Sequence, residues 1–358
     1  MQANLKIQSS NLISNKILCW YDKNKRILPW RFSGKGRINP YKIWISEIML
    51  QQTTVNTVVP FFNKFVKKWP GIEKLSNAKL DDVIIAWQGL GYYSRARNIY
   101  KTAQILKTKY NYKLPTNEAE LLLLPGVGKY TAAAILSMAY KKKAIPIDAN
   151  VKRVISRIYA IKSSESLYEY ENRVKKFSNQ LFPKIRNGDF AQALMDFGSI
   201  ICIPKNPKCN ICFLSKQCLA HRLNLSHAIP KQKKIKISRK KYGAAFIVIN
   251  NKNELILRKE NHNGVFANMM EIPSSLWQEK VLNRRKILQS APMKLKWKKL
   301  SRNVIHSFSH FSVEIEIYTG KIRKKNISGK WVKIDNVHKH PISNLVKKIV
   351  AVYSKCPI

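Results

Sequence analysis

Four of the chain's six cysteines lie within seventeen residues, in the spacing C-x6-C-x2-C-x5-C. They are Cys202, Cys209, Cys212 and Cys218. Cysteines this close together indicate a metal site, because soft thiolate ligands bind both zinc and iron–sulfur clusters. Structural zinc sites usually show two close cysteine pairs, whereas only one pair here is separated by two residues. The spacing therefore favours a cubane iron–sulfur cluster over zinc, and either over a disulfide framework.

The length of 358 residues exceeds the usual size of one domain, so we expect two. No apolar run reaches the roughly eighteen residues that a membrane span needs. Residues 1–24 lack the features of a secretory signal. We therefore expect a soluble protein in a reducing compartment, with no membrane partner, which again favours metal over disulfides.

The formal net charge is +46 at pH 7. A field of this sign attracts polyanions and raises their encounter rate, so it favours a nucleic-acid partner. Lys, Ile and Asn are abundant along the whole chain, as a codon bias toward A and T also produces. The charge supports nucleic-acid binding but does not show where on the protein it takes place.

Residues 1–221 are predicted to form a mainly helical region. Apolar residues recur at helical spacing from about residue 11, and Pro70-Gly71 and Asn187-Gly188 read as turns between helices. Clear helical stretches are 60–69, 80–87 and 174–182.

A basic linker at 222–241 and a second domain at 242–358 are predicted to follow. Seven of the last eleven linker residues are basic and none is aromatic. Residues 244–249 and 254–258 flank an Asn-rich turn, as in a β-hairpin, and 313–317 alternate apolar and acidic residues, as in a strand. The second domain is therefore predicted to mix helices and strands.

The first of three motifs in the helical region is Leu-Pro-Gly-Val-Gly at 124–128, between two apolar helical stretches. Gly126 and Gly128 permit a tight turn whose backbone N–H groups point outward at the start of the next helix, where the helix dipole favours an anion. A helix-hairpin-helix turn of this kind contacts the DNA backbone without reading its sequence. The alternative is an ordinary helix connection.

The second motif is Ile-Asp-Ala-Asn-Val at 147–151, about twenty residues after the hairpin. Asp148 can simply cap the next helix. With the hairpin and the cysteines also present, this position resembles the catalytic carboxylate of the helix-hairpin-helix DNA glycosylase superfamily. The endonuclease III branch of that superfamily carries a similar cysteine loop, here 202–218.

The third motif comprises three strings, at 28–31, 40–53 and 89–97. Together they resemble the adenine DNA glycosylases of the MutY type, which remove adenine mispaired with 8-oxoguanine. The resemblance runs in order from about Leu28 to Cys218, with a weaker continuation to the C-terminus. It implies a mainly α N-terminal region, with a six-helix barrel and a cluster domain, followed by an α+β Nudix-like domain.

The resemblance also implies a cofactor and a partner. It implies one 4Fe-4S cluster per chain, bound by the four cysteines. The partner is double-stranded DNA that contains adenine opposite 8-oxoguanine or guanine. We expect a monomer located in the cytoplasm, and associated with the nucleoid if the source is bacterial.

Catalytic roles follow from the same resemblance. Glu47 is expected to be the general acid and base, Asp148 to stabilise or capture the sugar cation, and Tyr130 and Asn150 to support them by hydrogen bonds. Breaking the adenine N-glycosidic bond needs a proton delivered to the base and negative charge facing an oxocarbenium-like sugar. Two carboxylates in unlike environments can divide these tasks. Glu47 lies in an apolar stretch, which suits a raised pKa.

Five further residues are expected to contact DNA bases. The target base must leave the duplex before the pocket can reach it. By resemblance, Gln52 and Tyr92 enter the base stack near 8-oxoguanine. Trp30, Arg31 and Gln192 are expected to contact the flipped adenine. In the alternative readings Tyr92 is a core aromatic residue and Gln192 a surface residue.

Tyr130 separates two kinds of glycosylase. In the bifunctional relatives a lysine occupies this position and forms a Schiff base that leads to strand cleavage. The adjacent Lys129 points about 100° away on a helix and cannot replace it easily. We therefore expect base removal with little strand nicking, although Lys152, near Asp148, could trap an abasic sugar.

The C-terminal domain resembles the Nudix-like recognition domain of the family. Phe308, Ser309 and His310 match the loop that contacts 8-oxoguanine, and the alternative is a plain strand start. The acidic cluster that binds magnesium in Nudix hydrolases is absent, so we expect no pyrophosphatase activity. Residues 33–37 lengthen the link between Arg31 and Pro40, and we expect them to form a surface loop.

Two other functions stay open on the sequence alone. One is a bifunctional pyrimidine glycosylase-lyase of the endonuclease III type, against which Tyr130 and the C-terminal domain argue. The other is a non-catalytic iron–sulfur DNA-binding protein, against which Glu47 and Asp148 argue.

Overall fold

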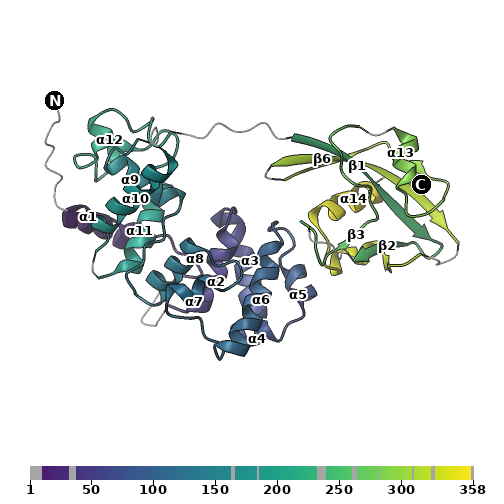
Figure 1. The fold of residues 1–358 in the computed structure, drawn as a ribbon, viewed down its shortest axis with the longest axis horizontal. Coiled ribbons are helices and arrows are strands. Elements are labelled where there is room, and N and C mark those ends of the chain that lie inside the picture. The colour runs from purple at the N-terminus through teal and green to yellow at the C-terminus, as the bar shows by residue number, and fades with distance from the viewer. Residues whose placement is uncertain are drawn as a thin grey trace. The chain divides into compact units, whose positions relative to one another are not determined.

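The protein divides into two compact units in a computed structural model (Figure 1). The first unit comprises 1–76 and 101–234, and the second comprises 77–100 and 235–358. The 33–37 extension, Ser309 and linker residues 232–238 lie outside the residues that the structure describes. Those residues are 10–31, 38–162, 166–183, 185–231, 239–259, 264–281, 283–308, 310–323 and 327–355.

The described part of the first unit is helical, as the sequence predicts. Its elements are α1 (Ser10–Asn24), α2 (Pro40–Leu50), α3 (Val55–Lys68), α4 (Ile72–Ser76), the larger part of α6 (Ser94–Lys109), α7 (Glu118–Leu122), α8 (Lys129–Ala134), η1 (Ile135–Ala139), α9 (Ala149–Ile158), α10 (Leu167–Leu181), α11 (Asn187–Ile200), η2 (Cys209–Ile211) and α12 (Leu219–Arg222). The turn predicted at Asn187-Gly188 is wrong. The chain turns one residue earlier, at Arg186, whose φ is 59°, and α11 begins at Asn187.

Helix α2 lies in the core of the first unit. Asn39 caps it by accepting a hydrogen bond from the Tyr41 amide, and Pro40 occupies the first turn, where its missing N–H costs nothing. Apolar residues occupy every face of the helix, and a helix of this composition is stable only when it is buried. The side chains of Trp44, Ile45 and Met49 have no exposed surface. Glu47 is therefore placed in the core by its neighbours.

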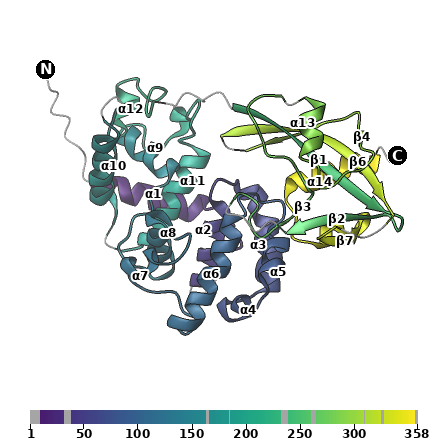
Figure 2. The same ribbon diagram turned by 45° about the vertical axis from the view of Figure 1, so that its right-hand side comes forward.

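The second unit contains a mixed sheet. Its elements are α5 (Leu80–Ala86), the start of α6, β1 (Arg239–Asn250), β2 (Glu254–Lys259), β3 (Met270–Glu271), α13 (Arg284–Gln289), β4 (Lys298–Lys299), β5 (Val304–Ser307), β6 (Phe311–Ile322), β7 (Lys330–Lys333), η3 (Ile334–Lys339) and α14 (Asn344–Lys355). The described strands follow the order β3-β2-β1-β6-β4, with β5 paired to β6 and β7 to β2. The predicted hairpin is confirmed, since β1 and β2 pair antiparallel. The long strands β1 and β6 pair in parallel (Figure 2).

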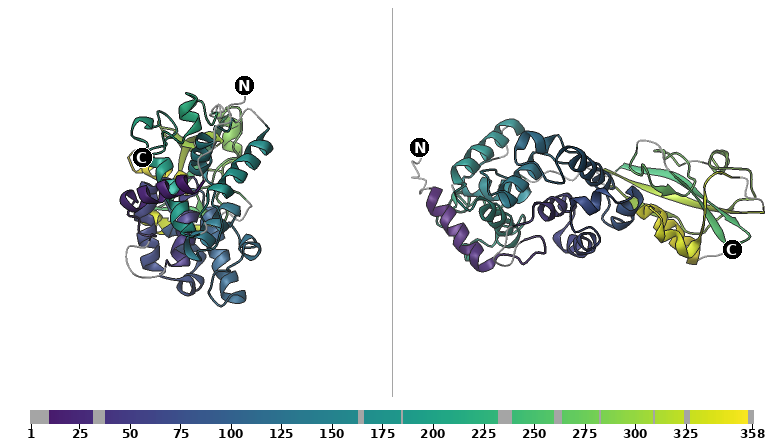
Figure 3. Two further views of the ribbon diagram at one scale, coloured as in Figure 1. Left: turned by 90° about the vertical axis from the view of Figure 1, so that its left-hand side faces the viewer. Right: turned by 90° about the horizontal axis from the view of Figure 1, so that it is seen from below.

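The two faces of the sheet bear different helices. Alternate residues of β1, including Ile247, pack with Val346 and Ile349 of α14, which lies along one face (Figure 3). The intervening residues, including Phe246, pack with Ile287 of α13 in a second apolar cluster. This alternation is the expected pattern for a strand buried on both faces, and it confirms the α+β prediction. Among the described helices, none is long and apolar enough to cross a membrane.

Candidate functional site

A pocket of about 580 Å³ in the first unit gathers most of the residues predicted for catalysis and base contact. Its volume falls in the range of roughly 300–1,000 Å³ that is usual for small-molecule sites. The predicted residues that line it are Trp30, Arg31, Glu47, Gln52, Tyr130, Asp148, Asn150 and Gln192.

Glu47 is a buried carboxyl group in this pocket, 4% exposed. Its Oε2 accepts a hydrogen bond of 2.9 Å from the Tyr130 hydroxyl. Burial raises the pKa of Glu47 to about 7; the charge of Asp148 also raises this pKa, while the Tyr130 hydrogen bond and Arg31 lower it. Burial and the neighbouring Glu47 hold the pKa of Tyr130 well above its usual value, so Tyr130 stays a donor. A carboxyl group of this kind can carry a transferable proton at neutral pH.

Asp148 has a different setting, at the N-terminus of α9. Its Oδ1 accepts a 2.7 Å hydrogen bond from the Val151 amide, and its Oδ2 accepts one of 2.8 Å from Nδ2 of Asn150. Asp148 therefore is a helix cap, and it also lines the pocket. A helix N-terminus favours nearby negative charge, and a carboxylate at this position can face a cationic sugar in the pocket.

Asn150 is itself held by a buried arginine. The Arg153 guanidinium donates from Nη2 to Oδ1 of Asn150 and to the Gly198 carbonyl, both at 2.8 Å, and from Nε to the Cys202 carbonyl at 2.8 Å. A Cβ atom on Gly198 would lie 2.8 Å from the Asn150 side chain, so glycine is needed for this close approach. One hydrogen-bonded path thus connects the first cysteine of the loop to Asp148.

Arg31 is oriented by a carboxylate that the sequence analysis did not single out. Asp196, on α11, has no exposed surface and accepts two hydrogen bonds from Arg31, at 2.5 and 2.9 Å, and one from Nε of Arg26 at 2.6 Å. Two guanidinium groups hold the pKa of Asp196 below its usual value despite its burial. Such a bidentate pair fixes the plane of Arg31 at the pocket wall.

The remaining pocket residues differ in exposure. Trp30 is 5% exposed, and its ring meets Phe62 edge-on at 5.2 Å. Gln192 is 4% exposed and donates to the Gly188 carbonyl at 3.2 Å, so the surface reading of this residue is wrong. Gln52 is exposed and has a left-handed φ of 57°.

The hairpin separates α7 from α8. Gly126 has a φ of 80°, which favours glycine, and Gly128 is the N-cap of α8. Lys129 is exposed, whereas the next residue, Tyr130, reaches Glu47. Lys152 forms an exposed ion pair of 2.7 Å with Glu171 instead of turning to Asp148. In this arrangement neither lysine reaches the two carboxylates.

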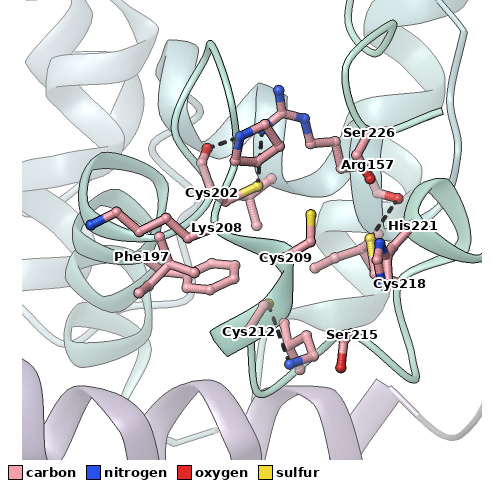
Figure 4. A pocket seen from close by; sticks show the side chains of 15 residues that line it. Arg157, Phe197, Cys202, Lys208, Cys209, Cys212, Ser215, Cys218, His221 and Ser226 are labelled. Carbon is pink, nitrogen blue, oxygen red and sulfur yellow. Dashed lines mark hydrogen bonds between the residues drawn. The ribbon is translucent and has the colours of Figure 1, made fainter. Parts of the chain in front are cut away.

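The four cysteines of the loop surround a small apolar cavity of about 20 Å³ (Figure 4). Nη1 of Arg157 donates to Sγ of Cys202, and the Leu214 amide donates to Sγ of Cys212, each at 3.4 Å. Burial raises the pKa of the Cys212 thiol to about 12 and that of Cys218 to about 11. These four sulfurs form no disulfide. N–H donors beside these partly buried sulfurs suit thiolates that bind a cationic centre.

Three predicted residues lie in the second unit and not at this pocket. Tyr92 belongs to the segment 77–100 and is 42% exposed, so it is not a core aromatic residue. Phe308 is half-buried and stacks on Phe311 at 4.6 Å, within an aromatic cluster. His310 is exposed. In the predicted recognition loop, Phe308 therefore packs against other aromatic residues, whereas His310 is exposed to solvent.

Comparison with known proteins gives the family. Residues 45–180 match the family described as HhH-GPD superfamily base excision DNA repair protein, and residues 244–352 match the NUDIX domain. The adenine DNA glycosylase of Buchnera aphidicola subsp. Schizaphis graminum is 36% identical over 351 residues, which cover 96% of this chain and 99% of the relative. The chain belongs to the adenine DNA glycosylase family. Members of this family are DNA repair enzymes that hydrolyse an N-glycosyl bond.

Solved structures agree for the helical part. A thermostable thymine-DNA glycosylase is 33% identical, covers 60% of this chain and 97% of its own, and has a TM-score of 0.54. The endonuclease III chain of a non-covalent complex with DNA is 24% identical, and the match covers 61% of this chain and 99% of that one. The TM-score is 0.50, which shows a shared fold. The predicted family, fold class and enzyme class are confirmed.

Residues that the sequence analysis missed act through other side chains. Asp196 orients Arg31, Arg153 orients Asn150, and Gly198 leaves space for Asn150. The signal available for Asp196 is its place between apolar residues, Leu194, Met195 and Phe197, because a carboxylate buried there needs a cationic partner. Asn150 is only three residues from Arg153, but the other two partners of Arg153, the Gly198 and Cys202 carbonyls, are distant in sequence, and no local pattern indicates them.

Proposed function

We propose that this adenine DNA glycosylase removes adenine paired with 8-oxoguanine or guanine from double-stranded DNA, without cleaving the strand. The observation that carries the proposal is the pair of unlike carboxyl groups in one pocket. Glu47 is buried, with a pKa of about 7, and Asp148 caps a helix with both oxygens accepting hydrogen bonds. One group can supply a proton while the other supplies negative charge.

The bond between C1′ and adenine breaks with its electron pair moving to the base. Glu47 donates its proton to a ring nitrogen of adenine, so that a neutral base leaves. Asp148 faces the oxocarbenium-like sugar and stabilises its positive charge. Water then adds to C1′ and gives a proton back to the carboxylate of Glu47, which leaves an abasic site. Tyr130 holds the Glu47 carboxyl group in place throughout.

Flipped adenine is proposed to lie against Trp30 and Arg31, with Gln192 at the buried end of the pocket. The fixed plane of Arg31 supports this role, because a guanidinium locked by Asp196 presents its remaining N–H groups in one direction. Gln52 and Tyr92 are proposed to fill the space that the base leaves, which offsets the cost of about a few kcal/mol for flipping. Exposure and left-handed backbone at both residues support this role.

The cysteine loop is proposed to bind one 4Fe-4S cluster with a structural role. Among the described residues, no three His, Cys, Asp or Glu side chains are grouped to hold a single metal ion. A cubane binds its four cysteines through four separate iron atoms, so its ligands need not converge on one point. The spacing of the four cysteines, with only one close pair, favours a cluster over zinc. When bound, the cluster supplies a rigid cross-link of the loop at 202–218.

The C-terminal domain is proposed to recognise the base opposite adenine, through the loop at 308–310. The full NUDIX-domain match at 244–352 supports the presence of a recognition domain. We also propose a monomer that is associated with the chromosome, which the net charge of +46 supports.

The experiment is a single-turnover assay on duplexes that carry adenine opposite 8-oxoguanine, guanine or thymine. Each product is split into two samples, with and without alkali, because an abasic site breaks only on alkaline treatment. We expect cleavage opposite 8-oxoguanine and guanine that depends on alkali. An equal yield of strand breaks without alkali would contradict base removal without strand cleavage. Excision of adenine only when it lies opposite thymine would contradict the proposed substrate.

A further inference from the structure

The segment that carries Tyr92 is part of the same compact unit as the C-terminal domain. Residues 77–100 cluster with 235–358, although they lie within the HhH-GPD match at 45–180. The boundary between the two units falls inside α6, between Tyr100 and Lys101. A piece of the glycosylase region thus forms one body with the Nudix-like domain.

Two side chains of this segment donate to backbone carbonyls of the C-terminal domain. Nε2 of Gln88 donates to the His340 carbonyl at 2.5 Å. Nη1 of Arg97 donates to the Ala267 carbonyl at 2.9 Å. Arg97 is half-buried, and this partial burial lowers the pKa of its guanidinium. The two contacts lie on either side of Tyr92 in the sequence.

Two further contacts extend the same interface. The Tyr93 hydroxyl donates to Oδ1 of Asn344 at 3.4 Å, next to Tyr92 in the chain. Nζ of Lys259 pairs with Asp81 at 3.4 Å, with both side chains nearly half exposed. Exposed pairs of this kind contribute little, roughly 0–1 kcal/mol. Among these contacts, those of Gln88, Tyr93 and Arg97 therefore contribute more to holding the segment than the Lys259–Asp81 pair does.

The loop itself has a backbone that needs support. Gly89, Gly91 and Tyr92 have φ angles of 113°, 70° and 48°. The left-handed conformation is costly for tyrosine and persists only where surrounding contacts determine it. From inside, Arg95 donates to the Leu90 and Gly91 carbonyls, at 3.0 and 3.1 Å. These contacts fix the base of the loop.

We propose that the C-terminal domain positions Tyr92 for insertion into the DNA stack, with Gln88 and Arg97 as the positioning residues. This inference rests on the proposed role of Tyr92 as the residue that enters the stack. The domain then has two tasks: it contacts the base opposite adenine and it holds the loop that opens the duplex. Because both tasks belong to one compact unit, binding of the domain to the opposite base also places the loop that carries Tyr92.

The first test is hydrogen exchange of the full-length protein without DNA. In Gln88→Ala/Arg97→Ala, the backbone amides of residues 87–95 are expected to exchange at least about fivefold faster than in the wild type, since two hydrogen bonds are lost. Asn344→Ala, on the other side of the interface, is expected to act in the same direction. Gln104→Ala is the matched control, because Gln104 lies on α6 and donates to the Ser76 carbonyl within the first unit. Equal loop exchange in all variants would overturn the proposal, whatever the substrate of the enzyme.

The second test asks whether the contacts act through Tyr92. Dissociation constants are measured for a duplex with a non-cleavable 2′-fluoro-adenosine opposite 8-oxoguanine, in a double-mutant cycle of Arg97→Ala and Tyr92→Ala. We expect Arg97→Ala to weaken binding about fivefold when Tyr92 is present and less than about twofold when it is Ala. Equal factors in both backgrounds would show that Arg97 does not act through Tyr92. If the wild type does not bind the mismatch better than a matched duplex, the proposed function fails, while the exchange result still tests the interface.

Discussion

The two carboxyl groups of the pocket differ because two different kinds of structure surround them. Glu47 lies in the middle of α2, a helix buried on every face, with one hydrogen-bond donor, Tyr130, at its Oε2. Asp148 lies at the first turn of α9, where the Val151 amide and Asn150 donate to it. Apolar burial favours the protonated acid, whereas a helix N-terminus favours the anion. Two carboxyl groups in one pocket thus have different environments according to their positions on a helix, and the proposed mechanism uses this difference.

The proposed difference between the two carboxyl groups is tested most directly by substituting each of them. Glu47→Gln keeps the shape and loses the transferable proton, and Asp148→Asn keeps the shape and loses the charge. Each is expected to lower single-turnover excision by at least about 100-fold, with mismatch binding retained. Excision and binding are measured on the same duplex. Near wild-type excision by both variants would mean that these residues are a core acid and a helix cap only.

The cysteine loop can be separated from the chemistry by substituting one ligand. The purified protein is expected to contain about four irons per chain with a broad absorption near the blue end of the visible. Cys209→Ser is expected to lose iron and to weaken DNA binding by about tenfold or more, because the loop loses its cross-link. Cys19→Ser is the control, as Cys19 is exposed and distant in sequence from the loop. Stoichiometric zinc with no iron would contradict the cluster.

Tyr130→Phe tests how the environment of Glu47 sets its pKa, because this substitution removes only the hydrogen-bond donor to Glu47. The hydrogen bond from Tyr130 lowers the pKa of Glu47, so its loss is expected to raise that pKa further. Excision at pH 7 is expected to change by less than about tenfold, while the alkaline limb of the pH profile moves to higher pH. A limb that moves to lower pH would show that the hydroxyl stabilises the protonated acid instead.

A smaller effect is expected on stability. The pKa of Glu47 is raised in the folded protein, so its contribution to stability is fully present below its unfolded value and is lost as pH rises through about 7. Glu47→Gln removes this loss. The free energy of unfolding of the variant, relative to that of the wild type, is expected to increase by up to about 3 kcal/mol from pH 5 to pH 8.5. Denaturant unfolding at both pH values measures the difference, and an equal gain at pH 5 would point to packing instead.

Much of this organisation follows from local sequence, and part of it does not. The apolar run around Glu47 and the capping position of Asp148 are local patterns, so both environments were predictable. The parallel pairing of β1 with β6 is not local, because the two strands are separated by some sixty residues. The same holds for Asp196, whose partners Arg26 and Arg31 come from another part of the chain. The turn before α11 is at Arg186, one residue earlier than predicted. Arg186 forms ion pairs with Asp22 and Asp189, and no turn pattern in the sequence indicates them.

The central claim is that Glu47 supplies the proton, and the pH dependence of single-turnover adenine excision tests it most directly. With saturating enzyme and adenine opposite 8-oxoguanine, the rate constant is expected to be level at low pH and to fall about tenfold per pH unit above about 7, because the acid form is consumed. In Glu47→Gln this descending limb is expected to disappear from the residual rate. A wild-type rate that stays constant from pH 6 to pH 9 would contradict the account.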